Sequence, residues 1–270
     1  MRKLLVTILF SLAATAAGAA EVHETIDRTL DFRPGARLAV DNVNGRITIS
    51  SWNEPRIRVR AEKVASGWDA EDLKTALREL KVEIQPNAGG VTVKTVSPDR
   101  GVNGFLDFLF GHHVNAHVTY DITVPRNADL NIETVNGSLH VDSVTGVLKL
   151  ETTNGKIEVA RCGGSLDAST TNGGIRAELV TVTPGKAMSF ETTNGHITVM
   201  VPANFAAAVD AATTNGRINT DLPITTRSID RNSLRGTING GNGGGTLRLR
   251  TTNGGIDIKT SSSPATQASR

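Results

Sequence analysis

The sequence predicts an all-β protein built as a β-solenoid, a single chain coiled into stacked rungs, with one short capping α-helix in its N-terminal half. Three observations carry this prediction. A Thr-Thr-Asn-Gly motif recurs, apolar and polar residues alternate on both sides of it, and the composition combines 27 glycines with only 7 Phe, 2 Trp and 1 Tyr. An antiparallel β-meander or sandwich is the alternative, because alternation by itself is compatible with both.

Residues 1–20 are predicted to be an export signal. Arg2 and Lys3 precede an apolar run, Leu4–Ala14, and small residues at Ala17–Ala19 provide a cleavage site after Ala19 or Ala20. The run is about half of the ~20 apolar residues that a membrane-spanning helix needs. No later stretch is long and apolar enough to span a bilayer, so we expect a periplasmic or extracellular protein without a transmembrane segment after cleavage.

The charge and cysteine content exclude several classes of protein. The formal charge is +2, and Arg2 and Lys3 lie in the predicted signal, so the remaining chain carries no net charge. A neutral chain that is poor in aromatic residues is not expected to bind nucleic acid. The single cysteine, Cys162, excludes an internal disulfide framework and a Cys-rich zinc site, and its turn-like setting predicts an inert thiol.

Residues 21–125 are predicted to be a β-rich part that caps the array. An alternating strand at 56–64 comes first, and Asp69 can then N-cap a helix to about residue 80. One helix face carries Leu73, Ala76, Leu77 and Leu80, and strands follow at about 81–85, 91–96 and 114–124. We expect the helix to cover an open end of the solenoid, since terminal units must protect their edges. A partner-binding helix is the alternative.

An apolar segment at 104–113 is unusual in a chain with so few aromatic residues. It contains Phe105, Phe108 and Phe110 together with two leucines. Our first interpretation is a loop folded onto the solenoid as a cap, and the alternative is an exposed patch that binds a partner.

Three histidines near this segment suggest a metal site, which the strand geometry argues against. His113 and His117 are four residues apart in the predicted strand, roughly 13 Å by strand rise, and His112 precedes them. Zinc ligands lie near 2.0 Å from the ion, so one ion cannot bridge such a pair. We predict no metal site.

Residues 126–260 are predicted to form the solenoid proper, followed by a disordered tail at 261–270. The motif asparagines stand at 136, 154, 172, 194, 215 and 253, separated by 18, 18, 22, 21 and 38 residues, and a further copy begins at Leu38. Two apolar columns are expected to face inward: residues 130, 148, 166, 188, 209 and 247 before the corner, and 139, 157, 175, 197, 218 and 256 after it.

The Asn-Gly pairs can supply either hairpin turns or solenoid corners, because both residues tolerate positive φ. Three features favour corners. The intervening connections lack hairpin dipeptides, the period is nearly constant, and identical Thr and Asn residues would stack about 4.8 Å apart. Outward threonines would then form one column: Thr153, Thr171, Thr193, Thr214 and Thr252. These threonines either present a binding surface or only satisfy hydrogen bonds at the corners.

No catalytic or cofactor-binding motif stands out. The Gly-rich stretch 239–245 lacks the Lys-Ser/Thr of a phosphate-binding loop and the aspartate of calcium-binding repeats. Thr and Asn are poor nucleophiles and bases without an activating partner. We therefore expect no enzyme, no catalytic residues, no cofactor and no metal. A carbohydrate-active β-helix enzyme is an alternative that acids clustered in one groove would support.

The motifs resemble a known group of proteins. The repeated Thr-Thr-Asn-Gly-x-Ile-x-Val, Val-Pro-x-Asn at 201–204 and Ser51-Trp52 after the first copy are similar to the bacterial exported repeat proteins known as putative adhesins, over residues 35–260. That resemblance implies a β-solenoid, export and no established catalytic residues. We expect a structural or adhesion-like module of the cell envelope with an unidentified protein or glycan partner. An envelope-stress accessory protein with a protein partner is the alternative.

Overall fold

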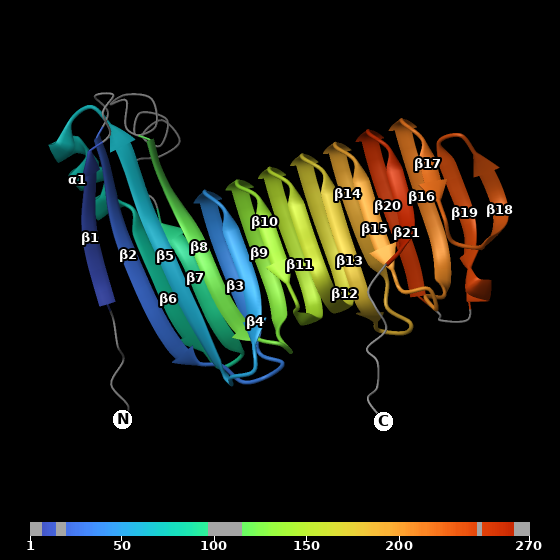
Figure 1. Ribbon diagram of the computed structural model, residues 1–270, viewed down its shortest axis with the longest axis horizontal. Coiled ribbons are helices and arrows are strands. Elements are labelled where there is room, and N and C mark those ends of the chain that lie inside the picture. The colour runs from blue at the N-terminus through green and yellow to red at the C-terminus, as the bar shows by residue number, and fades with distance from the viewer. Residues whose placement is uncertain (1–6, 15–19, 97–114, 242–244, 262–270) are drawn as a thin grey trace. The chain divides into compact units, whose positions relative to one another are not determined.

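Strands that end in the repeated motif pair in parallel with equivalent residues side by side, which confirms the β-solenoid and excludes a meander for the repeats. Leu148 pairs with Leu166 and Asn154 with Asn172, and the same register continues along the chain (Figure 1). The structure is a computed structural model that describes residues 7–14, 20–96, 115–241 and 245–261. It divides into two compact units, residues 1–140 and 141–270.

Unit 1 combines two rungs with additional strands and the helix α1. One sheet has the order β6-β7-β3-β9, and the other has the order β1-β2-β5-β8-β4. The strands are β1 Thr7–Ala14, β2 Ala20–Asp31, β3 Arg37–Asn44, β4 Ile47–Trp52, β5 Arg56–Gly67, β6 Lys81–Asn87, β7 Gly90–Val96, β8 Asn115–Pro125, β9 Asp129–Asn136 and β10 Leu139–Asp142, of which β10 extends into unit 2.

The predicted helix is confirmed as α1, Ala70–Glu79. The Asp69 side chain accepts hydrogen bonds from the backbone N–H groups of Glu71 and Asp72, so the N-cap is the predicted one. Leu73 and Leu77 are buried, and α1 packs on β5 and β2. The apolar face therefore contacts its own unit.

A buried polar network replaces the usual threonine in the first rung of unit 1. Asn42 occupies the position of the first motif threonine and donates to the Val118 carbonyl at 3.1 Å. Its amide oxygen accepts from the Thr95 hydroxyl at 2.8 Å, and Thr95 lies 2.6 Å from the Tyr120 hydroxyl. Burial raises the pKa of Tyr120, so its phenol stays protonated.

Unit 2 contains five rungs, each a strand, an Asn-Gly or Gly-containing corner and a second strand. Their strands are β11 Thr145–Asn154, β12 Ile157–Asn172, β13 Ile175–Val182, β14 Met188–Asn194, β15 Ile197–Val201, β16 Ala207–Asn215, β17 Ile218–Thr220, β20 Gly245–Asn253 and β21 Ile256–Thr260. The hairpin β18 Ile224–Asp230 and β19 Ser233–Ile238 follows β17, and a turn at Asn239–Gly241, in which all three residues have positive φ, follows the hairpin.

The order of the rungs in space differs from their order in sequence. β20 pairs with β14 on one side and with β16 on the other, and β21 lies likewise between β15 and β17 (Figure 1). The 38-residue spacing between Asn215 and Asn253 therefore does not contain a further rung, although it is about twice the spacing of the other copies. The hairpin β18–β19 fills that interval and covers the outer edge of β16.

The core of unit 2 lies between the two sheets. Both apolar columns predicted in this unit point inward, as Leu148 and Ile157 illustrate at 1% and 0% exposure. Ile218 is the exception, because it lies on the edge strand β17 and stays partly exposed. Cys162 is fully buried, and burial raises the pKa of its thiol to about 11. The thiol is therefore shielded and protonated, as an inert cysteine should be.

The segment predicted as an export signal contributes one described strand. β1 pairs antiparallel with β2, from Thr7 opposite Asp27 to Ala14 opposite Ala20. Export and cleavage of residues 1–20 remain predictions. Within the ranges that the structure describes, no helix is long and apolar enough to cross a membrane.

Candidate functional site: the threonine face

The two threonines of each Thr-Thr pair in unit 2 have different environments, because successive side chains of a strand point to opposite faces. The first threonine is buried and donates to the carbonyl of a glycine in the neighbouring rung: Thr170 to Gly155 at 2.9 Å, Thr192 to Gly173 at 2.8 Å, Thr251 to Gly195 at 3.0 Å and Thr213 to Gly254 at 2.7 Å. The second threonine is exposed: Thr153, Thr171, Thr193, Thr252 and Thr214, in spatial order. We call this outer column and its strands the threonine face.

The two threonines of one pair are expected to respond differently to the same substitution. Thr192→Val removes the hydroxyl that satisfies the Gly173 carbonyl, and should lower the free energy of unfolding by about 1–3 kcal/mol. Thr193→Val, on the exposed side, should change it by less than about 0.5 kcal/mol. Urea unfolding of both variants measures the difference. Equal losses would contradict the assigned roles.

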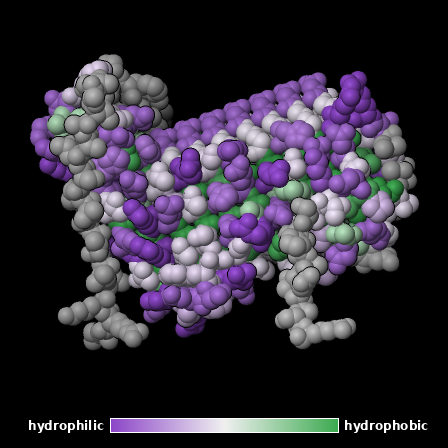
Figure 2. Space-filling view, viewed as in Figure 1, coloured by the Kyte–Doolittle hydropathy of each residue, from purple (hydrophilic) through white to green (hydrophobic). Residues whose placement is uncertain are grey.

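Asparagine side chains form a second column at the corners. Asn172 donates to Asn154, Asn194 to Asn172, Asn253 to Asn194 and Asn215 to Asn253, at 2.8 or 2.9 Å in every case. Figure 2 shows the corner edge of unit 2 as a regular hydrophilic row. These amides stabilise the corners, so they account for the asparagine of the motif without any ligand.

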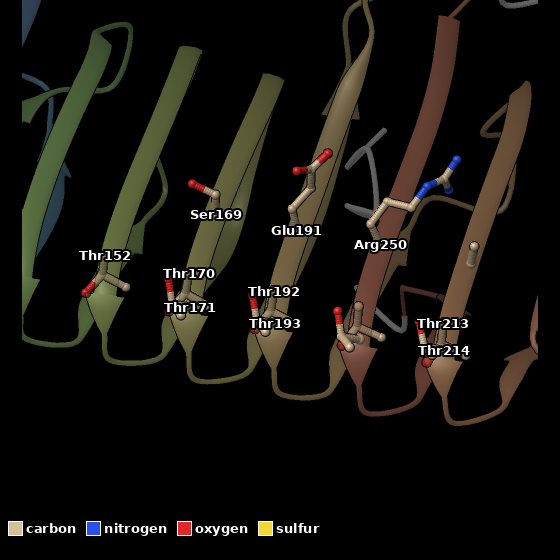
Figure 3. Close-up of a pocket in the computed structure, with 13 residues that line it drawn as sticks. Thr152, Ser169, Thr170, Thr171, Glu191, Thr192, Thr193, Thr213, Thr214 and Arg250 are labelled. Atoms are coloured by element: carbon tan, nitrogen blue, oxygen red, sulfur yellow. The ribbon is translucent and has the colours of Figure 1, made fainter.

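The threonine face is hollowed into a shallow groove of about 500 Å³. Short side chains make the hollow, and the longer Glu191 and Arg250 border it. In Figure 3, both lie farther from the corners than the threonines, as does Ser169. The lining is Thr152, Ser169, Thr170, Thr171, Glu191, Thr192, Thr193, Ala212, Thr213, Thr214, Arg250, Thr251 and Thr252. The exposed threonines and Ser169 offer hydroxyls to this groove, and each hydroxyl can donate and accept a hydrogen bond. The buried threonines Thr170, Thr192, Thr213 and Thr251 already donate to glycine carbonyls.

Acidic side chains lie on the neighbouring strands β11, β12 and β14, and Glu191 among them lines the groove. Asp167 lies on the strand between those of Glu151 and Glu191. Partial burial, and then the two neighbouring carboxylates, raise the pKa of Asp167 above its ordinary value. This side of the threonine face therefore carries negative charge.

Basic side chains gather on the opposite side. Arg250 donates to the side chain and backbone carbonyl of Asp210, and Arg235 donates to the same carboxylate at 3.3 Å. Partial burial would raise the pKa of Asp210, but these hydrogen bonds outweigh it and lower the pKa. The groove thus has an acidic border on β14 and a basic border on β20, and the two borders meet where Glu191 pairs with Arg250.

The structure places the five predicted threonines in one column on neighbouring strands. The other candidate residues, Phe105, Phe108 and Phe110, lie outside the described residues, as do His112 and His113. Among the side chains of the described ranges, no three of His, Cys, Asp and Glu are close enough to hold a metal ion.

Sequence reasoning missed the borders of the groove. Glu191 and Arg250 are neighbours across β14 and β20, although 59 positions separate them. Alternation identifies both as outward-facing, since each stands two residues before an exposed threonine. Their proximity depends on the inserted rung, which the sequence spacing does not reveal.

Comparisons with known proteins identify the family to which the sequence is similar. A family model described as Toastrack DUF4097 matches residues 26–259. No curated protein matches the chain. A solved putative cell adhesion protein from Clostridium sporogenes is 11% identical with a TM-score of 0.45, over 87% of this chain and 99% of its own. A putative adhesin from Bacteroides fragilis is 9% identical with a TM-score of 0.32, over 88% and 97%.

Proposed function

Because this chain belongs to the Toastrack DUF4097 family, we propose that it is an exported, non-catalytic interaction module of the cell envelope whose binding surface is the threonine face. The observation that carries the proposal is the groove itself. Four of the five exposed threonines, Thr171, Thr193, Thr252 and Thr214, line this hollow and recur at strand spacing, about 4.8 Å. Such a surface matches a ligand with regularly spaced hydroxyl groups, so we propose a glycan of the cell envelope as the partner.

The buried threonines support this assignment, because they show that the exposed threonines are not needed to hydrogen-bond the corners. Corner hydrogen bonds are made by the first threonine of each pair and by the asparagines. Thr171 and Thr193, by contrast, are exposed and line the groove. A polar, water-accessible surface of this kind suits a weak ligand that binds repeatedly along the array.

The binding test uses the protein recovered after export, with its N-terminus determined. We expect that N-terminus to be Ala20 or Glu21, and we expect binding to envelope polysaccharides on a glycan array. The triple variant Thr171→Val, Thr193→Val and Thr252→Val removes three hydroxyls while keeping side-chain shape. At about 0.5 kcal/mol or more for each lost hydrogen bond, affinity should fall about tenfold or more.

The matched control is Thr198→Val with Thr225→Val, which removes two hydroxyls from strands β15 and β18, outside the groove lining. Its affinity should equal that of the unmodified protein. No binding to any glycan, or equal losses in the two variants, would contradict the proposal. An N-terminus at Met1 after fractionation would contradict export separately.

The acidic border gives a specific reason to test carbohydrate cleavage as a second candidate function. Glycosidases use two carboxyl groups, one of them with a raised pKa, and the pKa of Asp167 is raised beside Glu151 and Glu191. Under the binding proposal, neither the unmodified protein nor Asp167→Asn releases reducing ends from a bound glycan. Release that the substitution abolishes would establish an enzyme instead.

A further inference from the structure

The C-terminal rung, Gly245–Thr260, occupies a position between two rungs that precede it in sequence. We call that position the rung slot, with β14 and β15 on one side and β16 and β17 on the other. Leu247, Leu249 and Ile256 are fully buried in it. The slot is therefore a binding site for a strand, corner and strand, and it is filled by the chain's own end.

The C-terminal rung makes the same kinds of hydrogen bond with both sides of the rung slot. Thr251 donates to the Gly195 carbonyl on one side, and on the other Thr213 donates to the Gly254 carbonyl, at 3.0 and 2.7 Å. Asn253 is held by one amide hydrogen bond on each side, both 2.8 Å long. What the slot selects is thus the Thr-Thr-Asn-Gly motif in a fixed register.

The corner glycines make this selection strict. A β-carbon on Gly254 would lie 1.9 Å from the Gly195 carbonyl oxygen, and one on Gly216 would lie 2.0 Å from the Gly254 oxygen. Only a rung with glycine at this place can approach both neighbours. This restricts the occupants of the slot to rungs of this type.

The connection from the hairpin β18–β19 to the C-terminal rung joins positions on opposite sides of β16. Ile238 and Gly245 flank Ala207 on opposite sides, so the end of the hairpin and the start of the rung are separated by β16. That connection begins Asn239-Gly240-Gly241, three residues with positive φ, and continues Asn-Gly-Gly in the sequence. Glycine adopts positive φ at little steric cost, so two of the three described residues of this connection are unstrained.

From these observations we propose that the rung slot accepts the C-terminal rung of a second copy, so that chains exchange Gly245–Thr260. The exchange preserves every contact described above and creates no new interface, which is the usual basis of domain swapping. It goes beyond the proposed function, because it requires no glycan and leaves the threonine face intact. The partner is another molecule of this protein, and the recognition element is the motif that builds its array.

Exchange is tested with full-length chains that each carry one new cysteine. Ser189 on β14 and Arg248 on β20 are direct neighbours across the slot. Neighbouring strands place such a pair within disulfide range. Differently tagged Ser189→Cys and Arg248→Cys proteins are mixed, incubated under native conditions at high concentration and oxidised. A covalent heterodimer forms when the rung of one chain enters the slot of the other.

The matched control mixes Lys149→Cys with Asp167→Cys, which are direct neighbours on β11 and β12. These strands belong to rungs that follow each other along the chain. We expect severalfold more heterodimer from the first mixture than from this one. Equal yields from the two mixtures would overturn the proposal, since exposed cysteines would then be reacting by collision alone.

A double variant tests whether fixing the rung in its own slot prevents exchange. In one chain, Ser189→Cys with Arg248→Cys should form an internal disulfide and abolish exchange, read as loss of the dimer peak in size-exclusion chromatography with light scattering. Cys162 stays buried and takes no part. Failure to form the internal disulfide would contradict the placement of the rung, and a dimer that persists in the locked protein would also overturn exchange. Glycan binding should be unchanged in the Ser189→Cys and Arg248→Cys variants, because neither residue lines the groove.

Discussion

Gly195→Ala is expected to destabilise the protein by more than about 3 kcal/mol. A β-carbon at this corner would lie 1.9 Å from the carbonyl oxygen of Gly173 in the adjacent rung. Overpacking usually costs about 1–3 kcal/mol when side chains can move, but here the obstacle is backbone. The rungs would have to separate, which would weaken the hydrogen bonds on both sides of the corner. The midpoint and slope of urea unfolding measure the loss.

Gly89→Ala is the control for this substitution. Its added β-carbon would meet only the Asn87 side-chain oxygen, at 3.5 Å, an ordinary contact. It should change the free energy of unfolding by less than about 1 kcal/mol. A similar small effect at Gly195 would show that the corners do not need close backbone approach, and would contradict the stacking described here.

Phe190→Ala should cost about 3–5 kcal/mol. Phe190 is fully buried on β14, one of the largest side chains in the core of unit 2, and it pairs with Ala168 and Leu249 on the neighbouring strands. Small neighbours such as Ala168 cannot fill the space that the ring leaves, so the cavity cost adds to the lost hydrophobic burial.

Val147→Ala is the comparison for Phe190→Ala, because Val147 is 54% exposed on the same sheet. It should cost less than about 0.5 kcal/mol. Thermal unfolding of both variants tests the expectation. A loss below about 1 kcal/mol at Phe190 would mean that the two sheets close over the cavity more easily than their register allows.

Local patterns in the sequence were sufficient for the elements and for the inward columns. Alternation placed Leu148 and Ile157 in the core, and Asp69 marked the start of α1. The exposed side of Thr193 followed from the same alternation. These features depend on residues close in sequence, where side-chain direction is fixed by the strand itself.

Local sequence patterns could not predict which distant segments contact each other. The five motif copies in unit 2 all read Thr-Thr-Asn-Gly, so the sequence does not specify which copy stacks on which. The insertion of β20 beside β14, and with it the proximity of Arg250 to Glu191, follows from how the hairpin β18–β19 covers β16. The groove borders could be identified as outward-facing, but not as neighbours.

The hydrogen bonds of the asparagine column align its side-chain amide dipoles in one direction along the array. All four side-chain hydrogen bonds in unit 2 run the same way, from Asn215 through Asn253 and Asn194 to Asn172 and Asn154. Amide dipoles aligned head to tail reinforce one another, as peptide dipoles do along a helix. The carbonyl, negative end of this dipole lies at Asn215 and the amino, positive end at Asn154. Each added rung would lengthen the dipole in the same sense, so successive corners favour one orientation of the next amide.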